Sequence, residues 1–145
     1  MGRYWLVGAC LLASGCVSVG FGRKVTTDEL VLRQEVEAYY NDVQRAFAAG
    51  NPDALSSLFS PSITKPMTLP EIRAWSQKFF SENGRASFKI EKLEFESLGF
   101  SDASVVLTYS VRTSGGKGDF SGIERNILVK RNGRWFTASW ERLSP

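Results

Sequence analysis

The hydrophobic pattern of this chain changes its period at Gly84, and that change limits the folds available to it. Before Gly84, apolar side chains recur every three or four residues, as at Leu32, Val36 and Tyr39. After it they alternate with other side chains, as in the run from residue 105 to 111. A period near 3.6 indicates amphipathic helices and a period of two indicates strands. The sequence therefore predicts an α+β fold, in which three N-terminal helices pack on one face of an antiparallel sheet.

Helix-capping residues divide the first half of the chain into three predicted helices. Thr26 and Glu29 form a capping-box pattern at the start of a long helix, which Gly50 is expected to end. Asn51, as a cap, is followed by Pro52 at the first position of a short second helix. A second capping-box pattern begins at Thr68. We therefore expect helices over residues 27–49, from residue 52 onward, and over residues 68–84, with one short strand around Ile63.

Four strands are predicted in the second half of the chain. The alternation changes parity between Ile90 and Leu93, which indicates a β-bulge near residues 91 and 92 and hence a bent sheet. Asn132 and Gly133 are typical of a two-residue hairpin turn. We expect strands around residues 88–95, 105–111, 123–129 and 135–140, with a flexible hairpin loop over residues 113–119.

The N-terminal segment resembles the signal peptide of a bacterial lipoprotein. Basic Arg3 precedes an apolar stretch over residues 4–13, which suits a secretory signal and is too short to span a bilayer. Small residues then lead to Cys16, as in the lipobox, where a diacylglycerol is attached to the cysteine sulfur. The resemblance implies a lipoprotein signal peptide over residues 1–15, lipidation at Cys16 and a lipidated tether over residues 16–26.

Other interpretations of this segment stay open. They are an ordinary signal peptide with an incidental cysteine, an uncleaved anchor from Tyr4 to Phe21, and lipidation at Cys10. A lipid anchor would place the protein in the bacterial cell envelope, with the membrane as its partner. Val17 and not aspartate follows Cys16, and in a Gram-negative host the resemblance then implies the outer membrane, facing the periplasm.

Composition excludes several kinds of site from the predicted domain. The chain of 145 residues has no histidine, and its two cysteines, Cys10 and Cys16, both precede the first helix. The domain therefore has no imidazole, thiol or disulfide to offer. The spacing of Glu91, Glu94 and Glu96 suits a solvated strand face, so we predict no metal and no cofactor. The net charge of +3 is interspersed, so we predict no nucleic-acid partner.

Two passages resemble the nuclear transport factor 2-like superfamily, which includes ketosteroid isomerase and SnoaL-like polyketide cyclases. They are AAGNPDALSSLFSPSI, residues 48–63, and the closing hairpin ILVKRNGRWFTASWERL, residues 127–143. The resemblance covers about residues 28–143 and implies a cystatin-like cone, in which a strongly curved sheet wraps around the long helix and leaves a pocket between them. It assigns residues 27–145 to one domain.

This resemblance carries no catalytic assignment onto the chain. In the ketosteroid isomerase branch the general base is an aspartate immediately before a proline, and here that position is Lys65, followed by Pro66. Val43 stands where that branch has its oxyanion-donor tyrosine, and the histidine of the cyclases is missing. We therefore assign no catalytic residue.

Seven side chains on elements expected to line the cone are candidates for ligand binding. Aromatic burial also stabilises ordinary cores, so each ring has a purely structural interpretation as well. Tyr109 and Arg125 carry polar tips at strand positions that we place on the inward face. The candidates are Tyr40, Lys65, Trp75, Phe79, Tyr109, Arg125 and Trp140.

The hypothesis from sequence is a membrane-anchored envelope lipoprotein whose domain is not an enzyme and binds a small apolar ligand or a partner protein. One alternative is a SnoaL-like enzyme of isomerase, cyclase or hydrolase type that acts on a small hydrophobic substrate through Tyr40, Lys65 or Asp42. A second alternative is a structural subunit of an envelope assembly. Family members often form homodimers through the outer face of the sheet, where we place Val106, Leu128 and Phe136.

Overall fold

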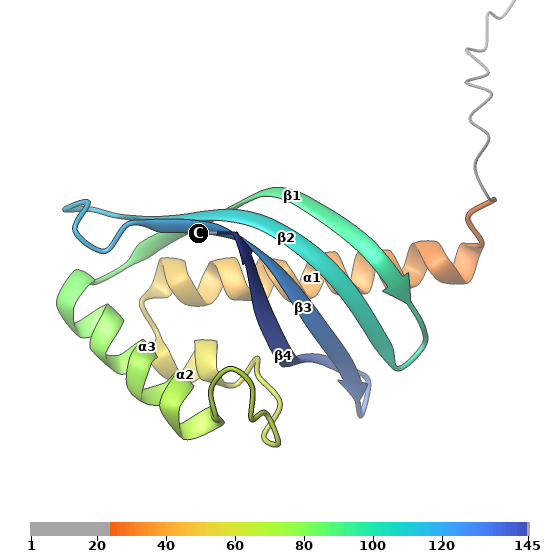
Figure 1. Ribbon diagram of the computed structural model, residues 1–145, viewed down its shortest axis with the longest axis horizontal. Coiled ribbons are helices and arrows are strands. Elements are labelled where there is room, and N and C mark those ends of the chain that lie inside the picture. The colour runs from red at the N-terminus through yellow and green to blue at the C-terminus, as the bar shows by residue number, and fades with distance from the viewer. Residues whose placement is uncertain (1–23, 145) are drawn as a thin grey trace, which may run out of the picture.

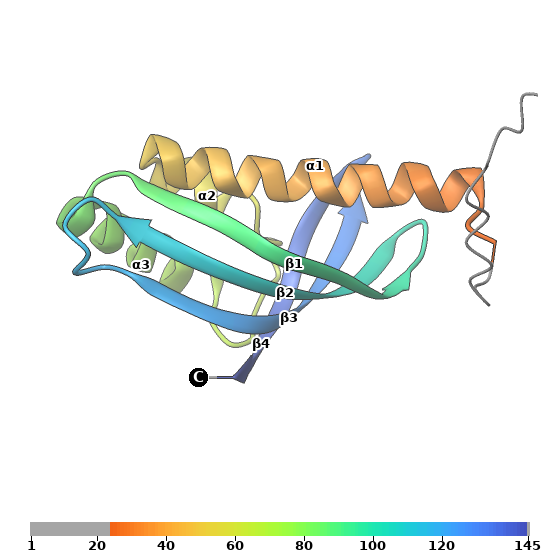
Figure 2. The ribbon, with the colours of Figure 1, turned by 90° about the horizontal axis from the view of Figure 1, so that it is seen from above.

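The computed structural model describes residues 24–144, and in this part of the chain three helices precede a four-stranded antiparallel sheet. Figures 1 and 2 show the sheet arching over the long helix α1, with α2 and α3 on the same concave side. The predicted α+β cone is therefore confirmed. The elements are α1 (Thr27–Ala49), α2 (Pro52–Ser56), α3 (Leu69–Asn83), β1 (Ala86–Leu98), β2 (Asp102–Thr113), β3 (Phe120–Arg131) and β4 (Arg134–Ser144).

The predicted signal peptide, Cys10 and Cys16 lie outside the described residues. Of the predicted tether, only residues 24–26 are described, and they precede α1 without regular secondary structure. Within residues 24–144, no helix combines the length and the apolar character that crossing a bilayer would require.

Local capping sets the ends of the helices as the sequence predicted. The Thr26 hydroxyl accepts a hydrogen bond from the Glu29 amide at 3.1 Å, and Gly50 ends α1 in the left-handed conformation with φ 61°. The carboxylate of Glu71 accepts a hydrogen bond from the backbone amide of Thr68 at 2.6 Å, which completes the capping box of α3. The boundaries therefore depend on contacts between residues three or four positions apart.

The strand predicted around Ile63 is wrong. Ile63 is buried, but the sheet contact of this region is a single bridge between Phe59 and Thr137 of β4. The Ser60 amide donates to the Thr137 carbonyl oxygen at 2.8 Å, and the Thr137 amide donates to the Leu58 carbonyl oxygen at 3.0 Å. The segment after Ser60 contains two prolines, which lack the amide hydrogen that a strand ladder needs. One bridge thus replaces a strand.

Side-chain hydrogen bonds join α1 to strands β3 and β4 and to the segment after α2. The Tyr39 hydroxyl donates to the Leu58 carbonyl oxygen at 2.9 Å and shares a hydrogen bond of 2.7 Å with the Thr137 hydroxyl. One turn earlier, Glu35 accepts hydrogen bonds from Lys130 at 2.7 Å and from the Trp135 indole at 3.0 Å. These hydrogen bonds hold the pKa of Glu35 below its ordinary value.

The predicted bulge and hairpin turn are confirmed. The register of β1 against β2 shifts between Ile90 and Lys92, and a second shift, which the sequence did not predict, lies between Phe95 and Ser97. Asn132 and Gly133 have φ values of 51° and 76°, the positive pair that a two-residue hairpin turn requires. The bulges bend the strands, and this allows the sheet to curve around α1.

The predicted orientation of β3 is wrong by one residue. Leu128 is fully buried in the core, whereas the Arg125 side chain lies on the outer face and pairs with Glu96 and Glu141. Neighbouring residues of a strand face opposite sides, so one misassigned position inverts the whole strand. Leu128 therefore contributes nothing to the outer face on which we expected a homodimer, and the homodimer itself stays a prediction.

Candidate ligand-binding cavity

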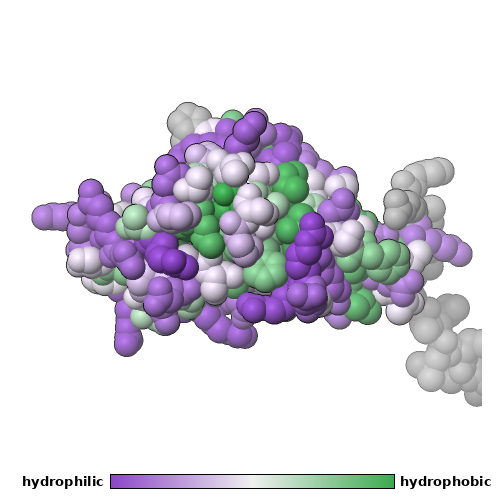
Figure 3. Space-filling view, turned by 90° about the horizontal axis from the view of Figure 1, so that it is seen from below, coloured by the Kyte–Doolittle hydropathy of each residue, from purple (hydrophilic) through white to green (hydrophobic). Residues whose placement is uncertain are grey.

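A cavity of about 720 Å³ lies between the concave face of the sheet, α1 and α3. This volume falls in the range of sites that hold small organic ligands. Figure 3 shows the molecule from below. Hydrophobic side chains gather near the middle of this lower surface, with hydrophilic ones around them. The cone is thus open to a ligand and is not packed solid by its aromatic residues.

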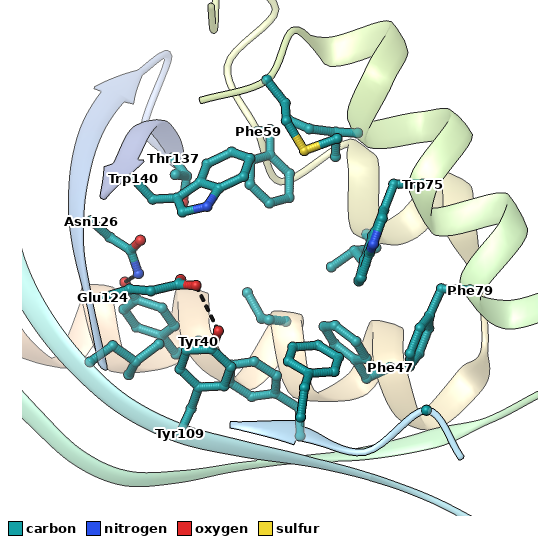
Figure 4. A pocket seen from close by; sticks show the side chains of 18 of the residues that line it. Tyr40, Phe47, Phe59, Trp75, Phe79, Tyr109, Glu124, Asn126, Thr137 and Trp140 are labelled. Atoms are coloured by element: carbon teal, nitrogen blue, oxygen red, sulfur yellow. Dashed lines mark hydrogen bonds between the residues drawn. The ribbon is translucent and has the colours of Figure 1, made fainter. Parts of the chain in front are cut away.

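Aromatic rings from α1, α3 and the sheet form one end of the cavity. Phe47 stacks on Phe88 with ring centres 5.1 Å apart, and Trp75 stacks on Phe79 at 5.1 Å. Trp75 is 39% exposed, which places it at the rim, whereas Phe47 and Phe79 are buried. Figure 4 shows Trp75, Phe79 and Phe47 together at this end. Such a cluster of rings offers a large apolar surface to a ligand.

Polar groups from β2, β3 and α1 gather at the opposite end (Figure 4). The Tyr109 hydroxyl donates to Oε1 of Glu124 at 2.6 Å. The side-chain amide of Asn126, two residues along β3, donates to the Tyr40 hydroxyl at 3.0 Å. Since residues two apart on a strand share a face, Glu124 and Asn126 both reach into the cone.

Burial changes the acid–base properties of this polar end. It raises the pKa of the Glu124 carboxyl above its ordinary value, although the hydrogen bond from Tyr109 and the charge of Arg142 partly oppose the shift. Burial likewise raises the pKa of the Tyr109 and Tyr40 hydroxyls, so both remain protonated. The polar end of the cavity therefore presents the Glu124 carboxyl next to two neutral phenols.

Arg142 of β4 lies opposite Glu124 in the β3–β4 ladder and lines the cavity, but its guanidinium is hydrogen-bonded to backbone carbonyl oxygens. Arg142 donates from Nε to the Ser144 carbonyl oxygen and from Nη2 to the Ser121 carbonyl oxygen, each at 2.8 Å. Within residues 24–144, no lysine or arginine lies at ion-pair distance from Glu124. No cluster of three metal-binding side chains occurs in this part of the chain either.

The rim of the cavity includes the loop between β2 and β3. Asp119 accepts hydrogen bonds from the Thr113 amide at 2.7 Å and the Thr113 hydroxyl at 3.1 Å, which orders the loop. Gly118 lies so close to α3 that a β-carbon there would be 2.5 Å from Oδ1 of Asn83. A larger residue at this position would therefore require the Asn83 side chain to move.

The structure brings five of the seven predicted pocket residues together. They are Tyr40, Trp75, Phe79, Tyr109 and Trp140, all of which line the cavity. The predicted placement of the other two is wrong: Lys65 is exposed in the segment before α3, and Arg125 is on the outer face of the sheet. Whether the five bind a ligand stays a prediction.

Sequence reasoning missed Glu124 and Asn126. Both lie on the face of β3 that the sequence-based prediction placed outward. That prediction therefore put Arg125 in the cavity, where the structure has Glu124. Their signal is in the pairing, because Glu124 lies opposite Leu107 of β2 and opposing residues share a face. Leu107 belongs to the alternating apolar run from residue 105 to 111 and is buried in the core.

We expect Glu124→Gln to change how stability depends on pH. The raised pKa means that the folded state disfavours the charged carboxylate, so Glu124 contributes to stability when protonated and loses that contribution as pH rises through its folded-state pKa. The free energy of unfolding of Glu124→Gln should therefore rise relative to that of the unmodified protein as the pH increases above about 4, the ordinary pKa of a glutamate. Urea unfolding at increasing pH measures the difference. Glu37→Gln, an exposed glutamate of α1, controls for loss of charge, and parallel curves for Glu124→Gln and the unmodified protein would contradict the expectation.

Comparison with known proteins places the fold among those of several solved structures. No protein-family model matches the chain, and no curated protein matches it either. A putative scytalone dehydratase from Novosphingobium aromaticivorans superposes with a TM-score of 0.67 at 16% identity, covering 83% of this chain and 89% of the other. A protein of unknown function with a cystatin-like fold from Nostoc punctiforme gives 0.62 at 10% identity, covering 83% and 93%. A Catenulispora acidiphila protein in complex with S-DNPA gives 0.63 at 17%, covering 78% and 92%. At these identities the likeness establishes the fold alone.

Proposed function

We propose that this chain, which has the cystatin-like fold of the nuclear transport factor 2-like proteins, is a ligand-binding domain held at the bacterial cell envelope by a lipid on Cys16. The observation that carries the proposal is the cavity of about 720 Å³ with its aromatic wall. An apolar molecule gains roughly 25 cal/mol for each Å² of surface that it buries there. The S-DNPA complex of the Catenulispora protein gives the proposal a parallel among proteins of the same fold.

Exposed apolar residues at one end of the domain support the membrane anchor. Val25, Leu30 and Val31 are each about half exposed, and Phe100, in the turn between β1 and β2, is 73% exposed. Figures 1 and 2 place that turn and the start of α1 at the same end of the molecule. Apolar side chains gathered there, next to the proposed tether, suit a surface that faces lipid.

An enzyme of SnoaL-like type is the second candidate function. The exposed position of Lys65 removes one of the three residues, Tyr40, Lys65 and Asp42, through which the sequence predicted that such an enzyme would act. Glu124 favours the hypothesis in another form, because a carboxyl that lines a cavity and whose pKa burial raises is suited to accept and donate a proton. Turnover of a bound molecule, abolished by Glu124→Gln, would distinguish this candidate from simple binding.

Native mass spectrometry of the full chain, released gently from membranes of the producing cell, tests ligand binding. We expect a bound small molecule in the unmodified protein and its loss in Val43→Trp, which fills the cavity from α1. Val31→Trp, an exposed valine of the same helix, is the matched control and should keep the ligand. Retention of the same added mass by Val43→Trp would place the ligand elsewhere and contradict the proposal.

A further inference from the structure

The cavity has a polar end and an aromatic end, and this arrangement bears on the chemistry of its ligand. Figure 4 shows Glu124 reaching toward the interior at one end, with Trp75 and Phe47 at the other. We infer that the ligand is an organic amine, whose cationic head lies against Glu124 and whose apolar body lies between the aromatic side chains. The inference rests on the proposed function, since it names the ligand class of the same cavity.

The first argument is that Glu124 forms no direct ion pair among the described residues, although the charge of Arg142 acts on it. Its Oε1 accepts the 2.6 Å hydrogen bond from Tyr109, which is a neutral donor. Arg142 is bound to two backbone carbonyl oxygens and forms no ion pair with Glu124 among the described residues. A carboxylate in a partly apolar cavity is costly unless a cation compensates it. A cationic ligand head would give Glu124 the direct ion pair that Arg142, held by backbone carbonyl oxygens, does not form.

The second argument is the set of rings beside the carboxylate. Tyr109 stacks on Phe88 with centres 5.2 Å apart, and Trp140 packs on Phe59 at 5.4 Å, so both rings are held in place. Figure 4 shows Glu124 between Tyr109 and Trp140. Ring faces attract a cation, most strongly in desolvated sites. A neutral molecule of the same shape would gain the apolar contacts but leave the carboxylate unpaired.

The remaining charged groups do not take over this role. Tyr40 from α1, Tyr109 from β2 and Arg142 from β4 are the titratable groups that interact with Glu124. Asp119, at the rim, pairs with Arg112, and Glu82 lies near Lys78 on α3. Lys117 is the remaining cation of the cavity lining and is exposed on the loop. Glu124 is thus the carboxylate that a cationic head inside the cavity would meet.

Isothermal titration calorimetry with two probes tests the inference on the full chain in phosphatidylcholine vesicles, with empty vesicles as the blank. The probes are 1-naphthylmethylamine, cationic at neutral pH, and 1-naphthalenemethanol, its neutral counterpart. We expect the amine to bind about tenfold more tightly, and Glu124→Gln to remove most of that advantage while changing the affinity for the alcohol less than about twofold. Acidification through the titration of Glu124 should weaken binding of the amine and not of the alcohol.

Glu82→Gln is the matched control, because it removes a carboxylate of the cavity lining that already lies near a lysine. It should leave the preference for the amine unchanged. Binding of both probes with equal affinity, or equal weakening of both by Glu124→Gln, would overturn the inference while leaving the proposed binding function intact. Failure of both probes to bind, together with no ligand in the native mass spectrum, would overturn the proposed function itself.

Discussion

Replacing Leu128 with arginine is expected to lower the free energy of unfolding by about 4 kcal/mol or more, which approaches the whole stability of a domain of this size. Leu128 is 0% exposed, and its partners across the sheet, Ala103 and Thr137, are buried as well. The guanidinium would enter the core without a counter-ion, and an unpaired buried charge is among the most costly changes known. Urea unfolding followed by circular dichroism measures the loss.

Val129→Arg is the control for this experiment. Val129 is the next residue of β3, half-buried on the outer face, where a long side chain extends into solvent. We expect a change of less than about 1 kcal/mol. The opposite result, in which Leu128→Arg is tolerated and Val129→Arg unfolds the chain, would mean that Leu128 faces outward and Val129 faces the core, as the sequence first suggested.

Replacing Cys16 with alanine is expected to abolish acylation and to shift the protein completely from the membrane fraction. The proposed lipid is attached to the Cys16 sulfur, and alanine has no atom to which it can be joined. Each buried methylene contributes about 0.8 kcal/mol, so two or three chains hold a protein durably and their loss releases it. Labelling with an alkyne fatty acid and fractionation of the envelope measure the two effects.

Cys10→Ala separates lipidation from a general effect on export. Cys10 lies six residues earlier in the same apolar segment, and its replacement should leave labelling and fractionation unchanged. Labelling that persists in Cys16→Ala and disappears in Cys10→Ala would move the anchor to Cys10. Labelling of neither protein, together with membrane association of both, would favour the uncleaved anchor instead.

The ends of the helices could be predicted because local contacts set them. Thr26 bonds to a residue three positions later, and Gly50 ends α1 through its own φ angle. The bulge after Ile90 was visible for a similar reason, since it changes which positions along one strand are apolar. The size of the cavity depends instead on the distance between α3 and the sheet, and no local sequence pattern determines that distance.

The parity of β3 could have been predicted from the hairpin turn. A two-residue turn at Asn132 and Gly133 places Leu128 opposite Thr137 and Val129 opposite Phe136. Opposing residues share a face. Leu128 and Phe136 therefore cannot both lie on the outer face, where the sequence-based prediction put them.

That prediction failed because β3 is apolar at consecutive positions, so its own alternation does not choose a face. Ile127, Leu128 and Val129 follow one another, and only the pairing decides which of them faces the core. The error also hid the polar end of the cavity, since Glu124 follows the parity of Leu128. The aromatic residues of the cavity were found because ring size alone favours burial.

The length of α1 has a consequence for how the anchored protein would meet its ligand. A helix rises about 1.5 Å per residue, so the twenty residues between Thr27 and Phe47 separate the proposed tether from the aromatic wall by about 30 Å. α1 thus lines the cavity and also separates the cavity's aromatic end from the proposed anchor. A domain standing upright on its anchor would hold its cavity clear of the headgroups and would exchange its ligand with the aqueous compartment, not with the bilayer interior.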